Sequence, residues 1–129
     1  MRMTRRQAIT GMLASASFSA MPSDQTKFDP DFGTAAAAAE AIRKKQISSV
    51  ELTTHILDRI AKYNGKLNAF VYVMRDEALA AAGTADKALS ENRILGPLHG
   101  VPINVKESFA VAGRPCTWGI PDLKNVKAP

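Results

Sequence analysis

The most informative part of this 129-residue sequence reads Gly96-Pro97-Leu98-His99-Gly100-Val101-Pro102-Ile103-Asn104-Val105-Lys106-Glu107-Ser108-Phe109. Two glycines and two prolines within seven residues require a specific backbone path. The alternating apolar residues that follow predict a short strand over residues 101–105, with Lys106 at its end. Beside a sheet covered on both faces, this lysine would lose hydration and could act as a base. The alternative is a solvated lysine paired with Glu107.

Two helices are expected upstream of this motif. Thr34 is placed to cap an alanine-rich helix over residues 35–45. Ser48 and Glu51 then have the spacing of a capping box, and apolar residues recur every four positions after them. Gly65 follows an asparagine and is predicted to end this second helix.

A strand and a third helix are expected between the second helix and the motif. Residues 68–73 are rich in β-branched and aromatic side chains, which predicts a strand. Residues 76–90 carry an alanine-rich apolar stripe at helical spacing, interrupted by Gly83. The resulting order of helix, helix, strand, helix and strand indicates an α/β fold.

The motif at residues 96–109 resembles the opening motif of the amidase signature family, as does the sequence that follows it, Val111-Ala112-Gly113-Arg114-Pro115-Cys116-Thr117-Trp118-Gly119. The upstream segments Ser48–Leu52, Asn68–Phe70 and Ala85-Asp86 also resemble that family. The resemblance covers roughly residues 34–120. It implies the N-terminal part of an α/β/α sandwich with a mixed central sheet, incomplete in this chain.

The resemblance implies a hydrolase of amide carbon–nitrogen bonds, with Lys106 as the catalytic lysine. Such enzymes use a Ser-cisSer-Lys triad, in which the lysine takes a proton through a bridging serine while a second serine attacks the carbonyl. The two serines lie near a Gly-Gly-Ser-Ser-Gly-Gly segment, which this sequence does not contain. The 129-residue chain is therefore expected to fold poorly and to be inactive alone. A small-molecule amide is the implied substrate, and no cofactor or metal is implied.

Other residues near the motif have simpler expected roles. Glu107 and the serine after it replace the Asp-Asn common in the family, which predicts an effect on packing or substrate contacts. His99 is expected to be a structural hydrogen-bonding group, and Cys116 a small packed residue. His55 is expected on the surface of its helix. Trp118 is expected either to line a substrate pocket or to pack in the core.

The N-terminal segment has the pattern of an export signal. Residues 1–20 contain three arginines and no acid, and the pair Arg5-Arg6 precedes a mildly apolar stretch, like a twin-arginine signal. Residues 21–33 are expected to be a linker, and residues 34–129 the N-terminal portion of a truncated amidase domain. Export to the periplasm is therefore predicted. The alternative is an N-terminal extension of a cytoplasmic protein.

Charge and composition exclude several other classes. The net charge of +5 includes +3 from the arginine-rich start, which leaves only +2 on the body and argues against a nucleic-acid partner. No apolar run is long enough to span a bilayer, and one cysteine cannot form an internal disulfide.

Three alternative functions remain open on the sequence. One is a non-catalytic interaction fragment, and another is one part of a split enzyme. The third is the glutamine-hydrolysing subunit of a tRNA-dependent amidotransferase, against which an export signal would argue. The sequence does not predict an oligomeric state.

Overall fold

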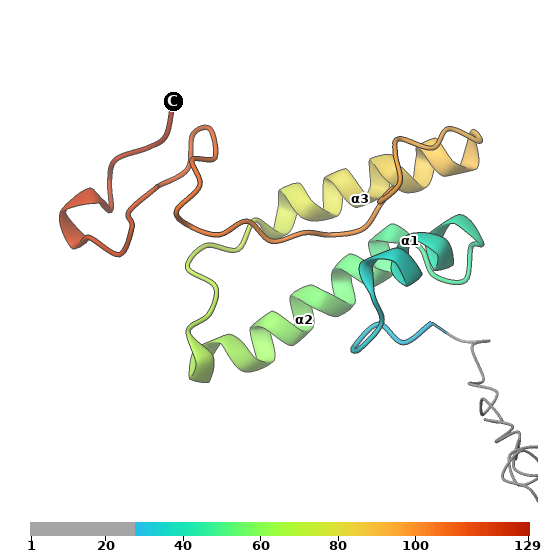
Figure 1. The fold of residues 1–129 in the computed structure, drawn as a ribbon, viewed down its shortest axis with the longest axis horizontal. Coiled ribbons are helices and arrows are strands. Elements are labelled where there is room, and N and C mark those ends of the chain that lie inside the picture. Colours follow the sequence, from blue (N-terminus) through green and yellow to red (C-terminus); the bar gives the residue numbers. More distant parts are fainter. Residues whose placement is uncertain (1–27) are drawn as a thin grey trace, which may run out of the picture.

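The structure is a computed structural model that describes residues 28–129, so the predicted signal segment at 1–20 and most of the linker at 21–33 lie outside it. Helices account for all the regular elements of the described part (Figure 1). They are α1 (Ala35–Arg43), α2 (Ser49–Leu67), α3 (Arg75–Ser90) and the short 3-10 helix η1 (Pro121–Leu123).

Helix α1 begins where the sequence predicts. The Thr34 hydroxyl accepts a hydrogen bond from the backbone N–H of Ala37 at 3.1 Å, which satisfies one free donor of the first turn. The helix ends at Arg43, two residues before the predicted end. Lys45 has a φ of +56°, in the left-handed region that an α-helix cannot include.

Helix α2 begins with the predicted capping box. The Ser48 hydroxyl accepts from the Glu51 backbone N–H at 3.0 Å, and the Glu51 carboxylate accepts from the Ser48 N–H at 2.8 Å. The predicted end at Gly65 is wrong, because the helix continues to Leu67. It ends at Asn68, which adopts the left-handed conformation with φ +50° and so supplies the cap that the glycine was expected to supply.

Helix α3 lies alongside α2 (Figure 1). Ala82, Ala85 and Ala88 are the buried residues of α3, at the helical spacing of three residues. Side chains of this size let the elements around the helix approach closely. The predicted helix over 76–90 is thus confirmed, with its start one residue earlier.

The hydrophobic core lies where α1, the start of α2 and the end of α3 meet. Ala38, Ile42 and Leu52 form its buried centre. Five partly buried apolar residues pack against this centre: Phe28, Ile47, Ile56, Leu89 and Val101. Because Val101 belongs to the Gly-Pro motif, the same core that joins the helices also fixes the start of that motif.

The two predicted strands do not form in the described part of the chain. Residues 68–73 and 101–105 have no strand assignment, and the only strand-like pairing in residues 28–129 is an isolated bridge between Pro115 and Lys127. A strand needs a neighbour to accept its ladder of hydrogen bonds, and neither segment has one here. A mixed central sheet is consequently not present among these residues, and Figure 1 shows the chain after α3 running back along that helix as irregular backbone.

Candidate active site

The Gly-Pro turn of the motif is attached to α3 through His99. This side chain is 3% exposed, and its Nδ1 accepts from the Leu95 backbone N–H at 3.0 Å. Its Nε2 lies 3.0 Å from the carbonyl oxygen of Ala85 in α3. Both ring nitrogens are occupied by the backbone, which confirms the structural role that the sequence predicts for His99.

Only glycine fits at position 100 without strain. It has a φ of +73°, and an added Cβ would lie 2.0 Å from Ser49 Oγ and 3.0 Å from Ser49 Cβ. A side chain at this position would therefore be strained by its backbone and would also collide with the first residue of α2. Ser49 is fully buried, and its hydroxyl has no hydrogen-bond partner in the described part of the chain.

Asp86 caps the N-terminus of α2 from the neighbouring helix. Its carboxylate oxygens accept from the backbone N–H groups of Ser49, at 2.7 Å, and Val50, at 3.0 Å. A carboxylate at a helix N-terminus also interacts favourably with the helix dipole. Sequence reasoning missed this cap, because the partners are 36 and 37 residues apart and no local pattern marks the pair.

Lys106 lies at the open end of the motif. The residue is exposed, and its ammonium group has no ion pair or hydrogen bond within residues 28–129. The expectation of a lysine beside a sheet covered on both faces is therefore not met in the described residues. The alternative, a pair between Lys106 and Glu107, is also absent from them.

The Glu107 carboxylate instead binds backbone N–H groups ten and eleven residues away. Oε1 accepts from Thr117, and Oε2 accepts from Trp118 at 3.0 Å. The donation by the Thr117 N–H, assisted by the Trp118 N–H, holds the pKa of Glu107 below its ordinary value. The Glu107 carbonyl oxygen also faces Cys116 Sγ at 3.6 Å, and this half-buried thiol fits the packed role predicted for it.

Residues 117–120 form a tight turn against Glu107. Trp118 has a φ of +52° and Gly119 a φ of +74°. The left-handed conformation costs a residue with a side chain about 1–2 kcal/mol, so the contacts with Glu107 offset a strain at Trp118. The Trp118 residue is 68% exposed, which rules out core packing within the described residues.

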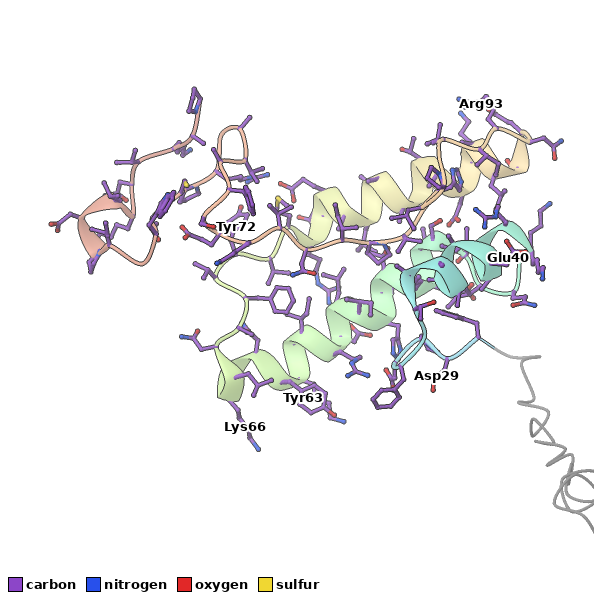
Figure 2. The ribbon with its side chains drawn as sticks, in the orientation of Figure 1. Asp29, Glu40, Tyr63, Lys66, Tyr72 and Arg93 are labelled. Atoms are coloured by element: carbon purple, nitrogen blue, oxygen red, sulfur yellow. The ribbon has the colours of Figure 1, made fainter. Side chains whose placement is uncertain are left out.

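Arg114 joins the C-terminal segment to the start of α3. Its guanidinium donates to the Tyr72 hydroxyl at 2.8 Å and pairs with the Glu77 carboxylate. The same guanidinium lies 5.1 Å from the centre of the Tyr72 ring, within cation–π range. Figure 2 shows Tyr72 where the irregular C-terminal segment meets the helices. Arg114 therefore holds residues 110–129 against the helical part.

His55 lies on the surface of α2, as the sequence predicts. Its Nε2 is 2.6 Å from Asp31 Oδ1, and Arg59 pairs with the same carboxylate. The hydrogen bonds from His55 and then Arg59 lower the pKa of Asp31. This cluster ties residues 28–33 to α2.

Two grooves open between the helices, and neither is lined by Lys106. The larger, of about 470 Å³, lies along the second half of α2, and the smaller, of about 320 Å³, lies between Lys45 and Asp86. No group of three or more metal-ligating side chains occurs within residues 28–129. No helix in that range is long and apolar enough to cross a membrane.

Comparison with known proteins identifies the class. A sequence profile described as "Amidase" matches residues 51–129, which is more than half of the chain. The chain belongs to the amidase signature family.

The relatives include a hydrolase and an amidotransferase component. Indoleacetamide hydrolase of Bradyrhizobium diazoefficiens is 45% identical over 96 residues, covering 74% of this chain and 18% of the relative. A glutamyl-tRNA(Gln) amidotransferase subunit of Nocardia farcinica is 41% identical over 97 residues, covering 74% of this chain and 20% of the relative.

A solved structure shares the fold. A bacterial aryl acylamidase of the amidase signature family matches with a TM-score of 0.70 and 35% identity, over 74% of this chain and 20% of that protein. The chain thus spans about a fifth of the length of the relatives it matches.

Proposed function

We propose that this chain supplies the lysine of an amidase-type hydrolase that cleaves amide carbon–nitrogen bonds. The observation that carries the proposal is the motif at residues 96–109, which lies inside the region matched by the amidase profile and contains Lys106. The fold shared with an aryl acylamidase supports the same function.

The proposed mechanism uses Lys106 with two serines that the family places near a Gly-Gly-Ser-Ser-Gly-Gly segment, which the 129 residues do not include. Lys106 takes a proton through a bridging serine in a cis peptide, while the nucleophilic serine attacks the amide carbonyl. Backbone N–H groups near the serines stabilise the oxyanion. The proton then passes to the departing amine, and water hydrolyses the acyl-enzyme. The isolated chain is therefore proposed to be inactive.

The exposed surface supports a need for further polypeptide around the motif. Large apolar side chains are exposed on both segments that the sequence predicts to be strands, among them Val71 at 73% and Ile103 at 78%. Contiguous apolar surface of this kind marks interaction sites in proteins. We propose that these two segments become strands of a mixed sheet when a serine-bearing polypeptide pairs with them.

The test is reconstitution. The 129-residue chain is produced together with the serine-bearing remainder of an aryl acylamidase, and hydrolysis of an anilide, indole-3-acetamide and glutamine is measured. Activity is expected only in the combined protein, and Lys106→Ala should lower it by about 10³-fold or more. Lys66→Ala, which changes an exposed lysine on α2, is the control. Full activity of Lys106→Ala would contradict the proposal.

The second candidate is a non-catalytic interaction fragment, which the same exposed apolar surface favours. This function predicts a stable complex between the chain and a serine-bearing partner, with hydrolysis unaffected by Lys106→Ala. The glutamine-hydrolysing component of a tRNA-dependent amidotransferase is the alternative within the family, suggested by the name of the Nocardia relative. Glutamine hydrolysis that exceeds hydrolysis of the anilide in the combined protein would favour it.

Export is proposed separately, on residues 1–20. A fusion of residues 1–33 to a reporter that is active only in the periplasm should be exported. Replacing both Arg5 and Arg6 by lysine should abolish export through a twin-arginine route. Unchanged export would contradict that route, and no export by the unaltered fusion would favour the cytoplasmic alternative.

A further inference from the structure

We propose that Glu107 is a positioning residue that holds the Thr117–Trp118 turn beside Lys106, and thereby places the Trp118 indole where it contacts the apolar part of an amide substrate. The inference rests on the proposed role of Lys106. It goes beyond that role because the Glu107 carboxylate and the Trp118 indole are not members of the triad.

Hydrogen bonds join the Glu107 side chain to the Thr117–Trp118 turn. Both Glu107 oxygens are used, one by the N–H of Thr117 and the other by the N–H of Trp118. The main-chain carbonyl of Glu107 faces the thiol of Cys116. Three consecutive residues, 116–118, therefore contact Glu107, which is the next residue after Lys106 in the chain. Any movement of Glu107 would alter the position of the turn relative to the lysine.

The two backbone donors of the turn require a carboxylate at position 107. Two adjacent N–H groups point at one side chain, and a carboxylate is the side-chain group that offers each of them an acceptor oxygen. The amide of glutamine has one acceptor, and its NH₂ would face the remaining N–H without a hydrogen bond. The lowered pKa of Glu107 agrees with a carboxylate stabilised in its charged form by these donors.

Trp118 combines a fixed backbone with an exposed position. The Trp118 residue is 68% exposed, and its backbone is held in a left-handed conformation at φ +52°. Thr117 reinforces the turn, because its hydroxyl accepts from Gly119 at 3.2 Å and its carbonyl oxygen accepts from Ile120 at 2.8 Å. These hydrogen bonds fix the turn, and within residues 28–129 the Trp118 residue on it is left exposed. Tryptophan in such a setting is well suited to bind a flat apolar group.

The substrate class follows from that ring. An indole stacks on flat apolar groups, so the inferred substrates are amides with an aromatic ring on the acyl or amine side. Small aliphatic amides have no aromatic ring to stack on it. The substrates named for indoleacetamide hydrolase and aryl acylamidase are of the aromatic kind.

The first test examines the contact in the 129-residue chain. Hydrogen exchange of the Thr117 and Trp118 amides is compared between the wild type and Glu107→Gln, and we expect exchange at least about tenfold faster in the variant. Glu91→Gln makes the same chemical change at an exposed acid that pairs with Arg93, and it should leave both amides unchanged. Glu107→Asp keeps the carboxylate and should restore part of the protection. Equal exchange in Glu107→Gln and the wild type would overturn the inference.

The second test examines substrate binding in the reconstituted enzyme. Trp118→Ala and Glu107→Gln should each raise KM for indole-3-acetamide by about tenfold, with KM for propionamide changed less than about twofold. A purely structural role would change kcat for both amides alike, and this result would overturn the inference. If the wild-type complex hydrolyses no amide, the proposed function fails, and the substrate contact inferred for Trp118 fails with it. Unchanged hydrogen exchange of the Thr117 and Trp118 amides in the first test would overturn this inference and leave the proposed function standing.

Discussion

The Nε2 atom of His99 lies 3.0 Å from the carbonyl oxygen of Ala85, so the Gly-Pro turn is bonded to the middle of the α3 surface that packs in the core. Since Nδ1 accepts the Leu95 N–H, the geometry places the ring proton on Nε2, which donates to Ala85. The imidazole thus serves as a spacer with one donor and one acceptor between two stretches of backbone.

His99→Ala should lower the free energy of unfolding by about 2–3 kcal/mol. The change removes two hydrogen bonds, leaves the Leu95 N–H without its acceptor and opens a small cavity. Urea unfolding followed by circular dichroism measures the loss. The control is His55→Ala on the surface of α2, where an exposed pair with Asp31 contributes much less to stability. Equal losses in the two variants would contradict the structural role of His99.

Gly100→Ala should destabilise the fold by about 2–4 kcal/mol. The added methyl group is strained at φ +73° and meets Ser49 inside the core. Gly83→Ala is the matched control, because nothing lies within 4 Å of its added Cβ and the residue is inside α3. That variant should be more stable than the wild type by up to about 1 kcal/mol. Thermal unfolding should show a lower Tm for Gly100→Ala and a higher Tm for Gly83→Ala than for the wild type.

Asp86→Ala should lower the free energy of unfolding by about 1–2 kcal/mol, because the first N–H groups of α2 lose their acceptor. Asp58→Ala, which removes an exposed pair with Arg75, should cost less. Hydrogen exchange at Ser49 and Val50 would locate the effect. Protection that persists at both amides in Asp86→Ala would refute the cap.

Stability should fall as the solution is acidified, partly through the capping box. The hydrogen bond from the Ser48 N–H lowers the pKa of Glu51 in the folded protein. A lowered folded pKa contributes stability above the unfolded pKa, and this contribution is lost as pH falls through the folded value. Glu51→Gln should therefore flatten the decline in urea unfolding measured from neutral to acidic pH. An unchanged decline in Glu51→Gln would contradict this prediction.

The sequence predicts the helices well because their signals are local. The Thr34 cap and the Ser48–Glu51 box each act within one turn, and both are present in the structure. The predicted end of α2 is wrong because two nearby residues, Gly65 and Asn68, could both supply a C-terminal cap. The left-handed conformation of Asn68 decides between them.

Non-local features are predicted less well. The composition of residues 68–73 and 101–105 favours strands, but composition cannot supply the neighbouring strand that a ladder requires. The contacts of Glu107 with Trp118 and of Asp86 with Ser49 join distant residues, and no spacing rule indicates them. The catalytic role of Lys106 stays a prediction from family resemblance.

The alanine face of α3 and the Asp86 cap have a consequence for protein synthesis. The core cluster, the Asp86 cap and the His99 bond that join the three helices to the Gly-Pro turn use residues no later in the chain than Val101. Domains form from the N-terminus as the ribosome extends the polypeptide. The helical unit can therefore assemble on the ribosome as soon as Val101 has emerged, and residues 102–109 leave the exit tunnel beside a surface that is already in place.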